Sequence, residues 1–295
     1  MKKNTTIYYF IIILFSLGLS ACISSTPYQI SSHASDHSII PIEQSCKTTN
    51  IFQSDNHQSV QNKGLNTDKI SILNWNVYKG SGNNWNDDFK LLSQDRDILI
   101  MQEARLDETL HQILDDQGFH WDLTSAFSYR NSQVGVMTAS KVKPIDLCSI
   151  HSKEPFIRLP KTLLVSLYPL AGSSEILLVA NLHGINFTLG TQSYQQQINH
   201  LQQVLQQHDG PMIVAGDFNS WSDGRMQIIE QLEQELSLEA LEYQNHNRTR
   251  IFGKAIDHIF YRGLTATDIT TPQVTSSDHN PIIVNFSINK ELSQK

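Results

Sequence analysis

The sequence predicts an α/β protein in which two sheets pack together and are covered by helices. From residue 70 onward, short apolar runs typical of β-strands alternate with longer stretches that have helical periodicity. The helical stretches fall between groups of strands, so each sheet can bury one face on the other sheet and one face under helices. No internal repeat interrupts this order.

Individual elements follow from the same patterns. The strand candidates are Ile70–Val77, Asp97–Met101, Gln133–Thr138, Thr162–Leu170, Glu175–Leu182, Met212–Ala215, Asp257–Tyr261 and Pro281–Phe286. The helix candidates are Trp85–Leu92, Leu106–Asp116, Thr191–Gln207 and Asp223–Leu236. In the third helix, Ile198, Leu201 and Val204 form an apolar stripe that indicates contact with the core. Gly118 and Gly210 stand where helix-ending glycines are expected.

The N-terminus has the features of a processing signal. Two lysines precede the apolar run Tyr8–Leu19, and small residues then lead to Cys22. This pattern resembles a bacterial lipoprotein signal, in which residues 1–21 would be removed and the Cys22 thiol acylated. An ordinary secretory signal or an uncleaved membrane anchor is the alternative, although the run is shorter than the ~20 residues of a bilayer span. We expect an exported, lipid-anchored protein, and Ile23 after the cysteine favours the outer membrane.

Composition divides the mature chain into three parts. Residues 22–68 are rich in polar side chains and bury too little apolar surface to order themselves, which predicts a flexible tether. Residues 69–288 are long enough for one domain with a full core, and residues 289–295 form a polar tail. We expect a monomer.

The cysteines suggest a covalent link between tether and domain. If Cys22 is acylated, Cys46 and Cys148 remain in an oxidising compartment, where they could form a disulfide. Another possible role for the tether is as a cap that docks on the domain through residues 39–42.

Polar side chains recur where the predicted strands begin or end. Strict alternation along a strand places the members of each neighbouring pair on one side. The residues are Asn74, Asn76, Glu103, Asn181, His183, Asp217, Asn219, Asp257, Asp278 and His279. Each could be a turn former, a cap or a satisfied core residue, but six such strand ends in one domain favour a shared site. Almost no Lys or Arg accompanies them.

The types of these side chains limit the chemistry. Carboxylate and amide oxygens are hard ligands that suit Mg²⁺ or Mn²⁺. Histidines and further acids beside a metal can activate a water and protonate a leaving oxygen. The sequence contains no HExxH motif, no cysteine pair of zinc-site spacing, no GxSxG elbow and no P-loop. A hydrolase that uses a metal-activated water is therefore favoured.

Taken in order, the motifs WN, QE, NLHG, GDFN, IDHI and SDHNP resemble those of the endonuclease/exonuclease/phosphatase superfamily. The resemblance spans about Ile70 to Phe286. It implies a four-layer αββα sandwich with two mixed sheets and a site at one end of them. It also implies a phosphodiester substrate, either a nucleic acid or a phospholipid head group, and a Mg²⁺ cofactor that Mn²⁺ could replace.

The resemblance implies a role for each motif residue. Asn76 and Glu103 would bind the metal, and Asp278 would support it. Asp217 would position or deprotonate the attacking water, and Asn219 would hold a phosphate oxygen.

The remaining motif residues would act on the phosphate or on the proton. His279 would be a general base or a phosphate contact, oriented by Asp257. His183 would contact the phosphate or the leaving oxygen, and Asn181 would contact the phosphate. Arg130 is either a phosphate contact or a solvated loop residue.

The substrate class is left open by the sequence. The NLHG motif resembles the deoxyribonuclease, sphingomyelinase and phosphatase branches and differs from the Tyr-x-Pro element of AP endonucleases. We slightly prefer a nuclease, although the formal net charge of -7 disfavours broad binding of polynucleotides. A lipid substrate agrees with the membrane tether, but no aromatic hairpin that would enter a bilayer is evident. The remote alternative is a binding protein that kept the fold and lost activity.

Overall fold

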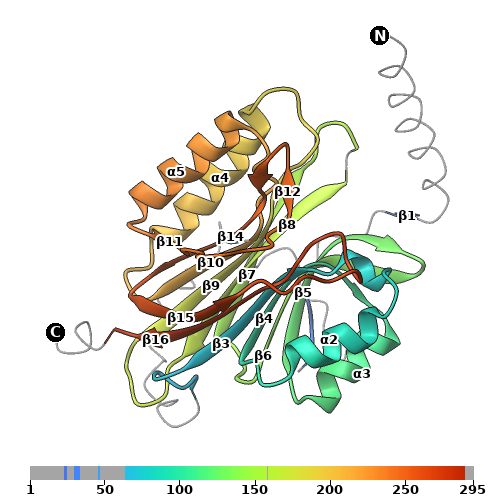
Figure 1. The fold of residues 1–295 in the computed structure, drawn as a ribbon. Coiled ribbons are helices and arrows are strands. Elements are labelled where there is room, and N and C mark those ends of the chain that lie inside the picture. Colours follow the sequence, from blue (N-terminus) through green and yellow to red (C-terminus); the bar gives the residue numbers. More distant parts are fainter. Residues whose placement is uncertain (1–22, 25–29, 34–45, 47–63, 158, 290–295) are drawn as a thin grey trace.

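The computed structural model describes residues 23–24, 30–33, 46, 64–157 and 159–289, and these form two sheets packed face to face with helices on both outer faces (Figure 1). The predicted fold class is confirmed. In Figure 1 the pair α4 and α5 covers one sheet, and the pair α2 and α3 covers the other.

The first sheet has eight strands. Its order is β1(Ile23–Ser24), β5(His120–Tyr129), β6(Ser132–Ser140), β4(Ile98–Leu106), β3(Ile70–Asn76), β16(Ile282–Ile288) and β15(Leu264–Thr270), with β2(Ile30–Ser32) also paired to β5. Only β3 and β4 run parallel. The helices on its outer face are α2(Trp85–Ser93) and α3(Glu108–Asp116), and the 3-10 turn η3(Tyr78–Gly80) follows β3.

The second sheet has six strands. Its order is β11(Glu239–Ala240), β14(Asp257–Arg262), β10(Met212–Asp217), β9(Ile176–His183), β8(Pro160–Pro169) and β7(Asp146–Lys153). Here β9 and β10 are the parallel pair. The covering helices are α4(Gln192–Leu205) and α5(Asp223–Glu235), and β12(Arg250–Ile251) forms a separate hairpin with β13(Lys254–Ala255).

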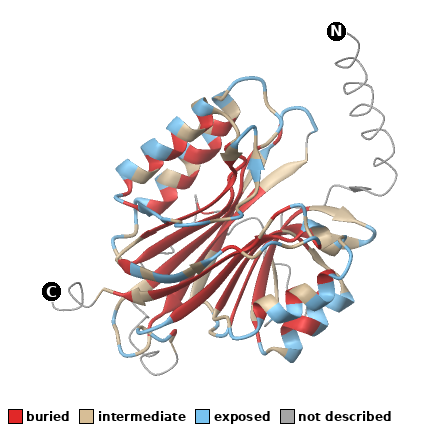
Figure 2. Cartoon of the chain, viewed as in Figure 1, coloured by how far each residue is buried: buried red, intermediate tan, exposed pale blue. Residues whose placement is uncertain are grey.

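The buried residues form three layers, one between the sheets and one under each helix pair. Both sheets are buried along most of their length, whereas the helices expose the side that faces away from the sheets (Figure 2). The predicted stripe Ile198, Leu201 and Val204 lies in the core under α4 and α5, as expected. Gly118 has the predicted left-handed backbone after α3, but α4 ends at Leu205, so Gly210 does not end it.

The layer between the sheets changes from apolar to polar toward one end. Along β3, Ile70 and Ile72 belong to the apolar layer, and Asn74 and Asn76 follow on the same side. The same change occurs in the other central strands. It is seen in Ile98, Ile100 and Gln102 of β4, Leu177, Val179, Asn181 and His183 of β9, and Ile213, Ala215 and Asp217 of β10. The polar residues therefore meet at one end of the sandwich.

Three long strands were not predicted. β5, β7 and β15 lack a clear apolar run. Polar side chains in β5 are buried because they have partners, such as Asp122, which accepts a hydrogen bond from Ser32 Oγ. Most residues of β15 stay at least partly exposed on the sheet edge.

The segment expected to be a free tether is attached to the domain wherever it is described. β1 and β2 both pair with β5, Ile30 is buried, and Cys46 forms the predicted disulfide with Cys148. Backbone hydrogen bonds and the covalent link replace the apolar burial that this composition lacks.

Some expectations fall on residues outside the described ranges. The signal peptide, Cys22, the docking of residues 39–42 and most of the polar tail are among them. Within the described ranges, no helix is both long and apolar enough to cross a membrane.

Candidate active site

A cleft of about 800 Å³ opens at the polar end of the sandwich. Eight of the ten residues that we predicted for catalysis, metal and phosphate binding line it, and a ninth contacts one of these eight. They are Asn76, Glu103, Arg130, His183, Asp217, Asn219, Asp278 and His279, with Asp257 directly behind His279. The tenth, Asn181, is considered below.

Asp217 lies at the centre of the cleft. Its Oδ2 accepts a hydrogen bond from Asn76 Nδ2 at 3.1 Å, and its Oδ1 accepts one from the Asn219 backbone N–H at 3.0 Å. The Nε2 atoms of His183 and His279 lie 3.4 and 3.8 Å from Oδ2. Burial raises the pKa of Asp217 to about 6, against the lowering effect of His279. The carboxyl group is therefore mostly ionised at neutral pH.

His279 is held as a cation by two carboxylates. Its Nδ1 lies 2.9 and 3.0 Å from the two oxygens of Asp257, as the resemblance implied. Burial lowers the pKa of His279, but Asp257 and Asp217 together raise it to about 10. Trp75 Nε1 donates to the His279 carbonyl at 2.8 Å and fixes the backbone. Nδ1–H thus donates to Asp257, and Nε2–H points toward the cleft centre as a donor.

His183 has the opposite protonation state. Its Nε2 lies 2.6 Å from Lys161 Nζ, and an ammonium group can only donate. Burial, followed by the charges of Lys161 and His279, lowers the pKa of His183 well below its ordinary value. The ring is neutral, so its approach to Asp217 is not an ion pair.

Glu103 reaches the cleft because the backbone of β4 is irregular. By alternation it would face the helices together with Leu99 and Met101. Its φ of 52° and the register shift between Met101 and Ala104 redirect the side chain. In the cleft, the Glu103 carboxylate forms an ion pair with Lys79 Nζ. Burial raises the pKa of Glu103, but Lys79 and Lys161 outweigh this effect and hold it below its usual range.

The donor set near Glu103 fits a divalent metal. Asn76, Glu103 and Asp278 all line the cleft, and their side chains carry oxygen atoms, the ligands that Mg²⁺ prefers. Asn76 Oδ1 accepts only the Tyr78 N–H, at 3.2 Å, so one of its two lone pairs is available. The Lys79 ammonium beside Glu103 shows that this carboxylate already attracts positive charge.

Asn181 does not reach the cleft, which corrects our expectation that it contacts phosphate. Its Nδ2 donates to the carbonyls of Met101 and Met137 at 3.1 and 2.9 Å, and its Oδ1 accepts from Gln102 Nε2 at 2.8 Å. All of these partners belong to the opposite sheet. Asn181 therefore joins the two sheets beneath the site.

Asn219 is positioned by the turn that follows β10. Its backbone φ is 50°, its Nδ2 donates to the Gly184 carbonyl at 3.1 Å, and its own carbonyl accepts from Arg225 Nη1 at 2.7 Å. A Cβ on Gly184 would come within 2.4 Å of the Phe218 carbonyl, so only glycine allows the two loops to approach this closely.

The sequence reasoning missed the lysines of the cleft. Lys79 follows β3 in the motif WNVYKG, and Lys161 lies at the start of β8, on the other sheet. Both line the cleft, as does exposed Arg130 at the β5–β6 turn. The position of Lys79 beside a predicted site residue was the one available signal. Nothing in the sequence linked Lys161 to the site.

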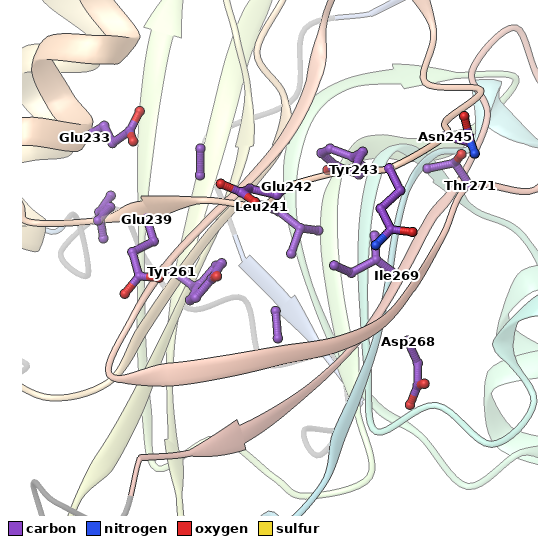
Figure 3. A pocket seen from close by; sticks show the side chains of 14 residues that line it. Glu233, Glu239, Leu241, Glu242, Tyr243, Asn245, Tyr261, Asp268, Ile269 and Thr271 are labelled. Atoms are coloured by element: carbon purple, nitrogen blue, oxygen red, sulfur yellow. The ribbon is translucent and has the colours of Figure 1, made fainter.

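A second hollow of about 1020 Å³ lies elsewhere, between the segment that includes β11 and the β15 edge (Figure 3). Its lining includes the acidic side chains Glu233, Glu239, Glu242 and Asp268. It shares no residue with the cleft and contains none of the predicted site residues.

Comparison with known proteins identifies the family of the chain. The sequence model of the Endonuclease/Exonuclease/phosphatase family matches residues 73–279. The chain belongs to the endonuclease/exonuclease/phosphatase family. A UPF0294 protein of Vibrio parahaemolyticus is 41% identical over 222 residues, covering 75% of this chain and 79% of that protein. A UPF0294 protein of Yersinia enterocolitica is 34% identical, covering 75% of this chain and 84% of that protein.

Solved structures of the family share the fold at low sequence identity. The human Nocturnin catalytic domain has a TM-score of 0.58 and 17% identity, covering 77% of this chain and 96% of that domain. ANGEL2, described as a 2',3'-cyclic phosphatase, has a TM-score of 0.57 and 17% identity, covering 76% and 96%. A mannosyl-6-phosphatase of Bacteroides thetaiotaomicron has a TM-score of 0.56 and 15% identity, covering 74% and 100%. As a family member, the chain has the fold of hydrolases that act on phosphoesters.

Proposed function

We propose that this family member is a Mg²⁺-dependent hydrolase of phosphodiesters, with Mn²⁺ as a possible substitute, in which Asp217 activates the attacking water. The observation that carries this proposal is the position of Asp217 between a cationic and a neutral histidine. Its Oδ2 lies 3.8 Å from His279 Nε2 and 3.4 Å from His183 Nε2.

The protonation states favour Asp217 over His279 as the base. With a pKa of about 6, Asp217 is ionised at neutral pH and can accept a proton from water. Asp257 and Asp217 raise the pKa of His279 to about 10, against the effect of burial, and this favours the protonated form, which is a donor and not a base. His279 is instead a donor to a phosphate oxygen, and Asp257 keeps it charged and oriented.

In the proposed reaction, the water oxygen forms a bond to phosphorus and the bond from phosphorus to the leaving oxygen breaks. Asp217 takes the proton from the water, and Lys161 or His279 donates to the oxygens on which negative charge develops. Asn219 and Arg130 are further candidates to contact the phosphate. A divalent ion held by Asn76, Glu103 and Asp278 would supply charge stabilisation at the phosphate when bound.

A substrate panel tests the proposal. Purified full-length protein should hydrolyse bis(p-nitrophenyl) phosphate only with Mg²⁺ or Mn²⁺. Asp217→Ala and His279→Ala should each lose ~10²- to 10⁴-fold in rate, whereas Glu242→Ala, in the second hollow, serves as the matched control. DNA, RNA, phospholipids and phosphomonoesters complete the panel, the last because two structural relatives are described as phosphatases. Equal, metal-independent rates for all three variants and the wild type would refute the proposal.

We also propose that the protein is exported and anchored to the outer membrane through an acylated Cys22. The lipoprotein-like signal supports this proposal. Metabolic labelling with a radioactive fatty acid should mark the wild type and not Cys22→Ser. Equal labelling of both proteins, or labelling of neither, would contradict it.

A further inference from the structure

Large apolar side chains gather at the mouth of the catalytic cleft. Among the described residues, the exposed large hydrophobics are Tyr78, Phe156, Ile157, Phe187, Leu189, Phe252 and, away from the cleft on α2, Leu91. Tyr78, Ile157 and Phe187 line the cleft directly. The other three near the mouth lie within two residues of a lining residue. An apolar patch of this kind that surrounds a site marks a contact surface.

The loops that carry these side chains are fastened to one another. Buried Glu154 accepts hydrogen bonds from the backbone N–H groups of Asn186 and Phe187, which ties the loop before Phe156 to the loop after β9. Trp221 Nε1 donates to Asn186 Oδ1 at 2.9 Å. These hydrogen bonds hold the loop before Phe156 and the loop after β9 in a fixed position relative to each other.

Fully buried Arg225 also holds the loop after β9 in place. Its Nη1 donates to the Ile185 carbonyl at 2.7 Å, and its Nη2 donates to the Asn186 carbonyl at 2.8 Å. Its guanidinium stacks between the rings of Tyr194 and Trp221, at 4.6 and 4.3 Å from their centroids.

A hairpin with an aromatic tip lies beside these loops, and no pattern in the sequence had indicated it. β12 and β13 are joined by Phe252 and Gly253, and Phe252 is 84% exposed at the tip. Its ring meets that of Trp221 edge-on at 6.0 Å. Ile251, the neighbour of Phe252, lines the cleft.

The strand that directly follows Cys22 in the sequence lies at the same mouth. β1 pairs with the end of β5, with Ile23 opposite Tyr129 and Ser24 opposite Ser128. Tyr129 and its neighbour Arg130 line the cleft. Ile23, the residue that follows Cys22 in the sequence, is thus paired with a residue that lines the cleft. The pairing of β2 with β5 and the Cys46–Cys148 disulfide attach two further points of the N-terminal segment to the domain.

We propose that the mouth of the cleft faces the lipid bilayer and that the substrate is a phosphoester in the head group of a membrane lipid. The apolar side chains enter the interface around the cleft, and the acyl anchor holds it there. Lys79, Lys161 and Arg130 offer positive charge to a phosphate inside the cleft, whereas the chain as a whole carries a formal charge of -7. This inference rests on the proposed hydrolase activity and on the acylation of Cys22.

Fluorescence quenching tests the orientation without reference to activity. Full-length protein is reconstituted into vesicles of phosphatidylcholine and phosphatidylglycerol whose acyl chains carry bromine, a short-range quencher. The extra emission of Phe252→Trp and Leu189→Trp, relative to the wild type, should be quenched at least about threefold more than that of Leu91→Trp, because interfacial side chains enter ~5–10 Å into the boundary between head groups and acyl chains.

Hydrolysis tests the substrate class. The double variant Leu189→Ser/Phe252→Ser should lower the ratio of vesicle-lipid hydrolysis to bis(p-nitrophenyl) phosphate hydrolysis by about tenfold or more, since each lost apolar contact weakens interfacial binding. Leu91→Ser is the matched control and should keep the wild-type ratio.

The outcomes separate the two proposals. Quenching no stronger than that of Leu91→Trp, with the soluble diester still hydrolysed, overturns the membrane-facing cleft and leaves the hydrolase standing. Strong quenching without hydrolysis of any substrate overturns the hydrolase and the lipid substrate together, and supports only the docking surface. Hydrolysis of DNA or RNA faster than of vesicle lipid overturns the lipid substrate.

A second, independent observation concerns a group of exposed histidine and aspartate side chains on α3 and just after β2. His33 Nε2 and His111 Nε2 lie 3.3 and 3.5 Å from the two oxygens of Asp115. The three ligand atoms lie within 4.8 Å of one another. The ring of His120 lies 5.7 Å from that of His33, and its buried Nδ1 has no hydrogen-bond partner among the described residues.

The geometry points to a Zn²⁺ site built from His33, His111 and Asp115, with His120 beside it. Imidazole and carboxylate ligands suit Zn²⁺, and His111 and Asp115 are one helical turn apart on α3. Because His33 follows β2, a bound ion would fasten the N-terminal segment to α3.

Equilibrium dialysis of the full-length protein against Zn²⁺ tests this site. The wild type should bind one more equivalent than His111→Asn and Asp115→Asn, while His246→Asn, at a partly exposed position elsewhere, should match the wild type. Equal stoichiometry and affinity in all four proteins would overturn the site. The readout is binding alone, so it does not depend on the catalytic metal.

Discussion

Protonation of Asp122 should control how strongly this buried side chain affects the stability of the domain. Asp122 is buried in β5 and accepts a hydrogen bond from Ser32 of β2. Burial raises its pKa from 3.8 to about 6, with Ser32 opposing the shift. The folded-state pKa exceeds the unfolded one, so the contribution of Asp122 to stability is complete below pH 3.8 and is lost as pH rises through 6.

The size of the effect follows from the shift. A difference of one pKa unit corresponds to about 1.4 kcal/mol, so Asp122 should lose about 3 kcal/mol of stabilisation between pH 4 and pH 7. The side chain of Asp122→Asn stays neutral at every pH. The free energy of unfolding of this variant, relative to that of the wild type, should therefore rise by the same amount between pH 4 and pH 7. Urea unfolding of the full-length, disulfide-intact proteins, followed by tryptophan fluorescence at several pH values, measures it.

Asp116→Asn, at an exposed position of α3, controls for the change in net charge. If the difference between wild type and Asp122→Asn is the same at pH 4 and pH 7, Asp122 does not titrate as its burial requires.

Three further predictions concern the site and its support. Asp257→Asn should lower the pKa of His279, so that the rate at pH 8 falls ~10²-fold or more and the alkaline limb of the pH–rate profile moves to lower pH; an unchanged limb would argue against the pair. Asn181→Leu should destabilise the fold by about 2–5 kcal/mol, because buried carbonyls lose their donor, and should leave KM unchanged in urea-free assays; a raised KM would restore Asn181 as a phosphate contact. Reduction of the Cys46–Cys148 disulfide should lower the free energy of unfolding by about 2–5 kcal/mol, since it closes a loop of 102 residues; identical urea curves with and without reductant would contradict this.

The strand-end residues could be predicted because alternation along a strand is a property of the backbone. Once Ile213 and Ala215 face the other sheet, Asp217 must face the same way. The same rule places Asn76 and His183. These side chains come together in one site because the two sheets pack with their polar ends on the same side.

Alternation failed where the backbone departs from a regular strand. Glu103 reaches the cleft through a left-handed residue and a register shift, which no apolar pattern indicates. Asn181 faces the other sheet, as alternation requires, but it lies two residues before His183 on β9 and therefore deeper between the sheets. There both its Nδ2 and its Oδ1 form hydrogen bonds with residues of the opposite sheet. Depth along the sandwich depends on strand register, which is a tertiary property.

The sequence by itself determined the fold class, the family and the chemical types gathered at the site, because these depend on periodicity and on the order of short motifs. Only the tertiary structure decided which of these groups are charged, since the protonation of His183 and His279 depends on Lys161 and Asp257 across the fold. It also decided what surrounds the cleft. Phe252 and Ile23 reach its mouth from opposite ends of the chain, and long-range pairing and packing bring them there.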